Sequence, residues 1–187
     1  WHSTDKYRRT IWRCNHKFNN DEVCTTPHLT NDEIQGYYLS ALRKLLTDKD
    51  EIIAAFEQAK DVAFDLSALT TERDELQKEL LVVSELMQQS MYENAHVVLD
   101  QAEYKKYYSG LTERFDKTKA RLEEVKGVIS NKEIRQATIE TFLDELKQLD
   151  GVAEFQPALW YGLADYMTVY SKDDVWVRFR DGTEIRV

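Results

Sequence analysis

The chain has 187 residues, of which 42% are hydrophobic, 11% aromatic and 32% charged, with a formal net charge of -9. This composition provides enough apolar side chains for a core but indicates a large solvated surface. No apolar run approaches the roughly 18 residues of a membrane span and the start has no signal-peptide pattern, which excludes a membrane protein and favours a soluble, cytoplasmic one.

The charge is unevenly distributed along the chain. Residues 48–150 hold 23 acidic and 14 basic residues, so this segment alone accounts for the net charge. Residues 1–20 hold five basic residues and one acidic residue. A basic end beside an acidic middle suits a protein whose end contacts phosphate, although ordinary local variation in composition gives the same pattern. The chain begins with Trp1 rather than Met, and we expect it to be a fragment of a longer protein.

A helix is predicted to begin after Pro27. Thr30 or Asn31 can cap its first turn, and the acidic Asp32 and Glu33 suit the positive end of the helix dipole. An apolar stripe at helical spacing follows, formed by Ile34, Tyr37, Tyr38, Ala41, Leu42 and Leu45.

Heptads dominate the middle of the chain from about Asp50. The first run has Ala59, Val62, Leu66, Leu69, Leu76, Leu80, Val83 and Met87 at steps of three and four, interrupted by Arg73. The second run has Tyr104, Tyr108, Leu111, Phe115, Thr118, Leu122, Val125 and Ile129. Such sustained spacing predicts a coiled coil. Because the connection is short, we expect two antiparallel helices of roughly 40 residues, each about 60 Å long.

The tip of this hairpin is predicted near residues 93–103, where the heptads lose register and Asp100 with Glu103 resembles a capping box. Apolar and aromatic side chains concentrate around it: Tyr92, His96, Val97, Val98, Leu99, Tyr104, Tyr107 and Tyr108. Exposed clusters of this kind often mark protein contacts. The alternative is that these side chains only stabilise the turn.

Period-two alternation replaces the heptads after Gly151 and a linker around Pro157. Three strands are predicted at 167–170, 175–180 and 183–187, with turns at Ser171–Asp174 and Asp181–Gly182. Three short strands are marginal alone, so we expect residues 6–14 to support them. Arg178 and Arg180 fall on the face away from the core and are weaker candidates for binding. The sequence therefore predicts a mainly α protein with a small antiparallel β platform and a long antiparallel coiled-coil hairpin.

Cys14 and Cys24 are the only cysteines, and His16 and His28 flank them. A cytosolic protein rarely keeps a disulfide, so a metal site or an inert pair of thiols is expected. Four-coordinate zinc needs four ligands, which these residues could supply together, but the spacing matches no self-contained zinc motif.

Four stretches carry a resemblance to a known family that extends over most of the chain. They are the segment from Trp1-His-Ser-Thr to Cys14-Asn-His-Lys-Phe, Cys24 with Thr26-Pro-His-Leu-Thr, Tyr92-Glu-Asn-Ala with Asp100-Gln-Ala-Glu-Tyr, and Val169-Tyr170 with Asp181-Gly-Thr-Glu-Ile. These stretches resemble parts of large serine recombinases, namely the second half of that family's zinc ribbon, the tip of its inserted coiled coil, and its closing strands.

The resemblance implies a regulatory, DNA-binding region without a catalytic centre, since the family's nucleophilic serine belongs to an upstream domain. Residues 1–47 would be a partial zinc-ribbon segment with a first helix, 48–150 the inserted coiled coil, and 151–187 a linker with the closing strands. Cys14 and Cys24 would be half of a zinc site; zinc is expected in the full-length protein and is in doubt in this fragment, which lacks the first cysteine pair.

The same resemblance implies partners for this region. DNA attachment sites would contact the basic ribbon, for which the candidates are Lys6, Tyr7, Arg8, Arg9, Arg13 and Lys17, each of which could equally lie on a solvated strand face. The tip would bind other recombinase subunits of the phage or mobile element and a recombination directionality factor, in the cytoplasm of a bacterial host. The alternative function is a structural or adaptor coiled coil without DNA binding.

Overall fold

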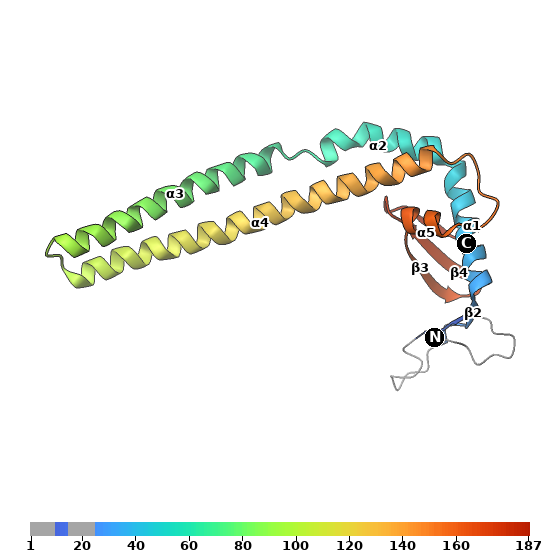
Figure 1. The fold of residues 1–187 in the computed structure, drawn as a ribbon, viewed down its shortest axis with the longest axis horizontal. Helices are drawn as coiled ribbons and strands as arrows, with labels where there is room; N and C mark the ends of the chain where they lie inside the picture. Colours follow the sequence, from blue (N-terminus) through green and yellow to red (C-terminus); the bar gives the residue numbers. More distant parts are fainter. Residues whose placement is uncertain (1–9, 15–24) are drawn as a thin grey trace. The chain divides into compact units, whose positions relative to one another are not determined.

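The structure is a computed structural model that describes residues 10–14 and 25–187. It is mainly helical with two small antiparallel sheets, which confirms the predicted fold class at that level (Figure 1). The elements are β1 (Ile11–Trp12), β2 (Leu29–Thr30), α1 (Asn31–Thr47), α2 (Lys49–Ala63), α3 (Ser67–His96), α4 (Gln101–Lys147), α5 (Pro157–Leu163), β3 (Ala164–Ser171), β4 (Asp174–Phe179) and β5 (Glu184–Arg186). None of the described helices is both long enough and apolar enough to span a bilayer.

The chain divides into two compact units. We call the first the platform; it comprises Trp1–Gln58 and Ala137–Val187. We call the second the arm; it comprises Ala59–Gln136, and therefore all of α3 and most of α4.

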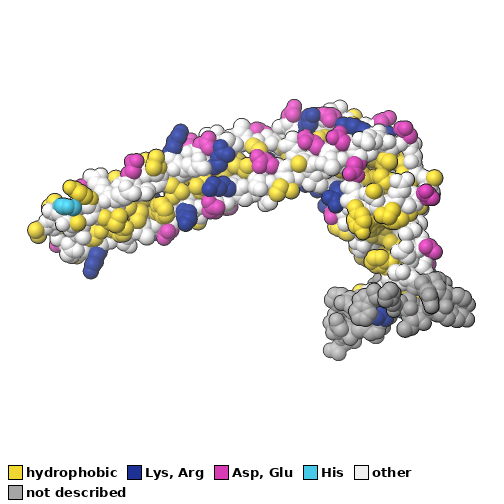
Figure 2. Space-filling view, in the orientation of Figure 1, with side chains coloured by type: hydrophobic (Ala, Val, Ile, Leu, Met, Phe, Trp, Pro, Cys, Tyr) yellow, Lys and Arg dark blue, Asp and Glu magenta, His cyan; other side chains and the backbone are white. Residues whose placement is uncertain are grey.

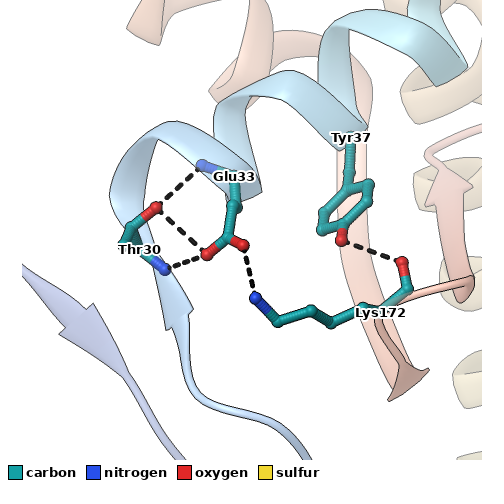
Figure 3. Close-up of polar contacts among 4 residues, drawn as sticks. All are labelled: Thr30, Glu33, Tyr37 and Lys172. Atoms are coloured by element: carbon teal, nitrogen blue, oxygen red, sulfur yellow. Dashed lines mark hydrogen bonds and ion pairs between the residues drawn. The ribbon is translucent and has the colours of Figure 1, made fainter.

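Helix α1 of the platform begins as its sequence predicts. The Thr30 hydroxyl accepts a hydrogen bond from the Glu33 amide at 3.2 Å, and the Glu33 carboxylate accepts one from the Thr30 amide at 2.7 Å, which completes a capping box (Figure 3). Lys172 donates to the same carboxylate at 2.7 Å, and the Tyr37 hydroxyl donates to the Lys172 carbonyl at 2.9 Å. The bond from Lys172, followed by those from Thr30, lowers the pKa of Glu33 to about 2. The two bonds that involve Lys172 join α1 to the β3–β4 turn.

The strands β3, β4 and β5 form the predicted antiparallel meander, in that order. Val177 pairs with Met167 on one side and with Ile185 on the other. At the Asp181–Gly182 turn, Gly182 has a φ of 104°, a conformation that only glycine adopts without strain. Along β4 the side chains of Val175, Val177 and Phe179 are fully buried, whereas those between them are half-exposed. One face of the meander therefore belongs to the core.

The core of the platform consists of that sheet face, α1 and the last turns of α4. Tyr38 is fully buried; its ring lies 5.0 Å from that of Trp160, and its hydroxyl donates to the Leu159 carbonyl at 2.7 Å. Phe142 of α4 is also fully buried, and its ring lies 6.4 Å from that of Phe179. Apolar side chains from distant parts of the sequence thus close one core around the inner face of the sheet.

Two predictions for the platform were wrong. The described part of residues 6–14 does not join the meander, because Ile11 and Trp12 pair with Thr30 and Leu29 in a separate two-stranded sheet. The meander is instead covered by α1, whose apolar stripe fits its inner face. The expected linker around Pro157 contains helix α5, which has proline in its first turn, and β3 begins at Ala164 rather than at residue 167.

The arm contains an antiparallel pair of helices. Glu72 lies against Arg121 and Glu79 against Arg114, so residue numbers rise along one helix as they fall along the other. Helix α3 has 30 residues and α4 has 47. The prediction of one helix from residue 50 to the tip was wrong: the chain breaks between Ala63 and Ser67.

The break is stabilised by local hydrogen bonds. The Asp65 carboxylate accepts bonds from the Ser67 amide at 2.8 Å and the Ser67 hydroxyl at 2.9 Å, which lowers the pKa of Asp65. Lys132 of α4 donates to the Asp65 carbonyl at 3.2 Å. Short polar side chains that bond the nearby backbone compete with helix formation, which explains why a heptad pattern did not preserve the helix here.

Candidate interaction surfaces

The apex of the arm is the four-residue connection Val97–Asp100 between α3 and α4. Asp100 caps α4 through its carboxylate, which accepts bonds from the amides of Ala102 at 2.7 Å and Glu103 at 3.1 Å. Gln101 donates its side-chain amide to Asn94 at 2.9 Å, across the connection. Polar bonds therefore help to stabilise the turn.

The apolar side chains of the apex are free to contact another molecule. Val98 is fully exposed, at 103% of its reference area, and Val97 and Tyr92 are more than half exposed. The Tyr92 ring stacks on that of His96 with centroids 4.1 Å apart, and the Tyr92 carbonyl lies 2.8 Å from His96 Nδ1. The exposed Val98 side chain and the stacked rings of Tyr92 and His96 provide a hydrophobic surface of the kind that anchors protein interfaces.

The eight residues predicted for the apex do not form one surface. Tyr104 and Tyr108 are half-buried and lie near each other, with ring centroids 5.8 Å apart, and the Tyr108 hydroxyl reaches Met91 Sδ at 3.6 Å. Tyr107 is 53% exposed. Positions 107 and 108 fall on different sides of a helix, so only one of them can join the row of half-buried tyrosines. Leu99 is half-buried in the connection.

The candidate DNA contacts are described at one position only. Arg13 is exposed and directly follows β1, whereas Lys6, Tyr7, Arg8, Arg9 and Lys17 lie outside the described residues. Their role stays a prediction.

The candidate metal ligands are also described only in part. Cys14 is half-buried after β1, and His28 is exposed before β2, while Cys24 and His16 lie outside the described residues. Within residues 10–14 and 25–187, no group of three or more His, Cys, Asp or Glu side chains is arranged to hold a metal ion. The described donors therefore do not make up the four ligands of a zinc site by themselves.

Sequence reasoning placed Arg178 away from the core but missed the aromatic surface around it on the outer face of the meander. Tyr166, Thr168 and Tyr170 of β3 alternate with the half-buried Met167 and Val169, and on β4 Trp176 and Arg178 alternate with buried core residues. With Glu184, the outer residues line a shallow pocket of about 410 Å³. Arg178 forms an ion pair with Glu184 at 2.8 Å and lies 5.8 Å from the centre of the Tyr166 ring. The alternation that placed Arg178 could also have identified these aromatic residues.

Comparisons with protein-family models, with curated proteins and with solved structures found no match to this chain.

Proposed function

We propose that this chain is a DNA-binding and subunit-interaction region of a site-specific serine recombinase, with α3 and α4 as a coiled coil inserted in a partial zinc-ribbon-like domain. In this proposal the apex joins recombinase subunits and so controls synapsis and directionality. The basic segment before α1 contacts the attachment site. Chemistry belongs to a catalytic domain elsewhere in the full-length protein.

The observation that carries the proposal is the exposed apolar apex. Val98 is fully exposed on a turn that the Gln101–Asn94 and Ala102–Asp100 hydrogen bonds stabilise. Hydrophobic groups held in water on a rigid support favour association with a complementary surface. A second copy of the arm provides such a surface, because it carries the same exposed Val98.

Support for DNA binding comes from charge. The five basic residues among the first twenty contrast with the acidity of residues 48–150. Phosphate contacts are governed by local positive charge, and an acidic arm would be repelled from the duplex. The arm would then remain available for protein contacts while the basic segment binds.

Sedimentation velocity tests the role of the apex. The change Val98→Asp adds a charge to an exposed side chain and should weaken self-association of the chain about tenfold or more while leaving its helix content unchanged. Val82→Asp is the matched control, because Val82 is also exposed on α3 but lies away from the apex. Equal effects of the two substitutions would refute a specific apex contact.

Salt-dependent binding tests the role of the basic segment. The full chain is titrated with a labelled duplex that carries an attachment half-site. Replacing Arg9 and Arg13 by Ala should reduce the slope of log affinity against log salt by about 2, because each phosphate contact contributes about 0.9. The control replaces Lys78 and Lys106, which are on the arm. Apex association without DNA binding by the wild-type chain would favour the alternative, an adaptor coiled coil.

A further inference from the structure

The two outer strands of the meander differ in how well their edges are protected. β3 and β5 flank β4, and no other described strand pairs with either of them. β5 has only three residues, of which Glu184 and Arg186 are charged and exposed. β3 has eight residues, of which Asp165 alone is charged. Because short strands and charged side chains discourage pairing with another chain, the β5 edge is protected and the β3 edge is not.

The direction of the backbone bonds in β4 shows which groups of β3 reach its free edge. The Phe179 amide donates to the Thr183 carbonyl at 2.9 Å, and the Val187 amide donates to the Val175 carbonyl at 2.8 Å. The odd-numbered residues of β4 therefore bond to the β5 side. Since successive residues of a strand bond to opposite sides, the even-numbered residues of β4 bond to β3.

The same alternation applies to β3. Tyr166 and Thr168 lie opposite even-numbered residues of β4 and so use their backbone groups on that strand. The amide and carbonyl of Met167 and the amide of Val169 point the other way, and no described residue bonds to them. These two residues therefore present main-chain donors and an acceptor at the free edge of the sheet.

A recess of about 710 Å³ runs along this edge. Its lining includes Met167 and Val169, whose side chains lie on the core side of the sheet, and Tyr166, whose side chain lies on the outer side. Side chains from both faces of one strand meet in a single recess at the edge of a sheet. Figure 2 shows hydrophobic side chains gathered on the platform over α5 and β3.

The walls of the recess are mainly apolar and aromatic. Trp12 of β1 and Ile34 of α1 line it, and so do Trp160 and Tyr161 of α5. Trp12 is 55% exposed and Tyr161 is 72% exposed. Exposed aromatic rings beside unpaired main-chain groups suit a ligand that brings both backbone hydrogen bonds and apolar side chains.

We propose that the β3 edge binds an extended, apolar segment of a partner protein, which pairs with β3 as an additional strand. The main-chain groups of Met167 and Val169 select a strand over a helix, because a helix uses its own amides and carbonyls internally. Pairing from Asp165 to Val169 spans about 13 Å at about 3.3 Å per residue. This inference goes beyond the proposed function, since it concerns the platform and a partner other than DNA or a second recombinase subunit.

Shape decides against a second copy as the occupant. In a second copy the same edge lies in the same recess, between the side chains of Trp12 and Tyr161. Paired strands lie about 4.8 Å apart, and the walls of two recesses would meet before two such edges came that close. A free peptide strand has no walls of its own and can enter.

Fluorescence anisotropy of the full chain with two probes tests the pairing. The first probe is a labelled, end-blocked peptide of sequence Thr-Val-Tyr-Val-Thr. The second has the same side chains but esters in place of its internal amides, which removes its N–H donors without adding bulk. The ester should bind about tenfold more weakly, because about two main-chain bonds are lost. Equal affinities, or no binding of the amide peptide, would overturn the proposal.

Proline substitutions at the two edges locate the site. Met167→Pro removes an N–H that points away from β4, so it should weaken binding of the amide peptide about fivefold or more and leave the urea midpoint of the platform nearly unchanged. Glu184→Pro removes an outward N–H at the β5 edge and should leave binding unchanged. Equal losses in both variants would overturn the assignment of the site. The ester comparison uses the wild-type chain, so it decides the proposal even where a proline variant does not fold.

Sedimentation velocity of Met167→Pro distinguishes a separate partner from a second copy. Its self-association should equal that of the wild type, and a reduction would overturn the choice of a separate partner as the occupant. The apex and DNA experiments can succeed or fail independently of these results.

Discussion

Replacing Tyr38 by Phe isolates one buried hydrogen bond of the platform. The Tyr38 hydroxyl donates to the Leu159 carbonyl at 2.7 Å, and the residue is fully buried. Phenylalanine keeps the ring and its edge-on contact with Trp160 but removes the donor. An acceptor left without its partner in the interior costs about 1–3 kcal/mol, whereas removal of the ring in Tyr38→Ala should cost about 3–5 kcal/mol.

The adjacent Tyr37 provides the matched control. Its hydroxyl also donates to a backbone carbonyl, that of Lys172, at 2.9 Å, but this bond is exposed. Water can replace the lost donor in Tyr37→Phe, so the expected cost is about 0.5 kcal/mol or less. Two substitutions of identical chemistry should therefore differ several-fold in the free energy of unfolding because of burial alone.

Urea denaturation followed by tryptophan fluorescence measures the difference. All four tryptophans belong to the platform, so the signal reports on that unit. With a slope of about 2 kcal/mol per M, a loss of about 2 kcal/mol lowers the urea midpoint by about 1 M, and the Tyr37 variant should shift it by about 0.2 M. Similar shifts for the two variants would refute the assignment of Tyr38 to a sealed core.

Alkaline pH provides a second readout for the same residue. Burial raises the pKa of Tyr38, and the negative charge of Glu145 adds to the rise. Because the folded state favours the neutral phenol, this contribution to stability is complete below the ordinary pKa of about 10 and is lost progressively above it. The decline in the urea midpoint above that pH should be smaller in Tyr38→Phe than in the wild type.

Two further predictions concern the acid limit of the platform and the glycines. Hydrogen bonds from Lys172 and Thr30 lower the pKa of Glu33 from 4.5 to about 2, so its contribution to stability is present above pH 4.5 and is lost as the pH falls through about 2. Urea midpoints from pH 2 to pH 6 should therefore fall less steeply in Glu33→Gln. Gly182→Ala should cost about 1–2 kcal/mol because of its positive φ, whereas Gly110→Ala in α4 should stabilise the arm by about 0.5–1 kcal/mol. Denaturation followed by fluorescence measures the change in stability for Gly182→Ala, and denaturation followed by circular dichroism measures it for Gly110→Ala. A change of the same sign in both variants would contradict the reasoning.

Local sequence signals predicted several features correctly because they depend on few residues. The cap at Thr30, which the sequence offered beside Asn31, follows from one side chain and the backbone next to it, although the reciprocal bond of Glu33 was not predicted. The turn at Gly182 follows from the conformational freedom of one residue. Such features are determined before any tertiary contact forms, so they can be read from the sequence with little context.

The break in the first helix of the predicted hairpin could not be found from periodicity. Val62, Leu66 and Leu69 keep heptad spacing through it, yet Val62 is 83% exposed and the helix is interrupted. Apolar spacing indicates which side of a helix is buried but not whether the backbone is continuous. Asp65 and Ser67 carried the relevant signal, because the Asp65 carboxylate accepts bonds from both the amide and the hydroxyl of Ser67.

The sequence predicted a candidate surface only where the local amino-acid composition alone was enough to indicate an exposed apolar cluster. The concentration of apolar residues near Val98 indicated an exposed apex, but it did not separate Tyr107 from Tyr108. To separate the two tyrosines, each residue must be assigned to its heptad position and so to one side of the helix. The same operation separates the side of the arm with the Glu72–Arg121 ion pair from the side with the half-buried Leu80 and Phe115, a difference that composition conceals because both sides belong to one acidic segment.

The incomplete burial of the arm follows from geometry. Two helices can bury only the rows that face each other, and a third surface is needed to cover the rows beside them. On one side of the pair, Glu72 and Glu79 extend over the interface to reach arginines of α4 and help to cover it. On the other side, Leu80 and Met87 of α3 and Tyr108 and Phe115 of α4 stay half-buried. Two helices alone therefore leave these outer rows partly in contact with water.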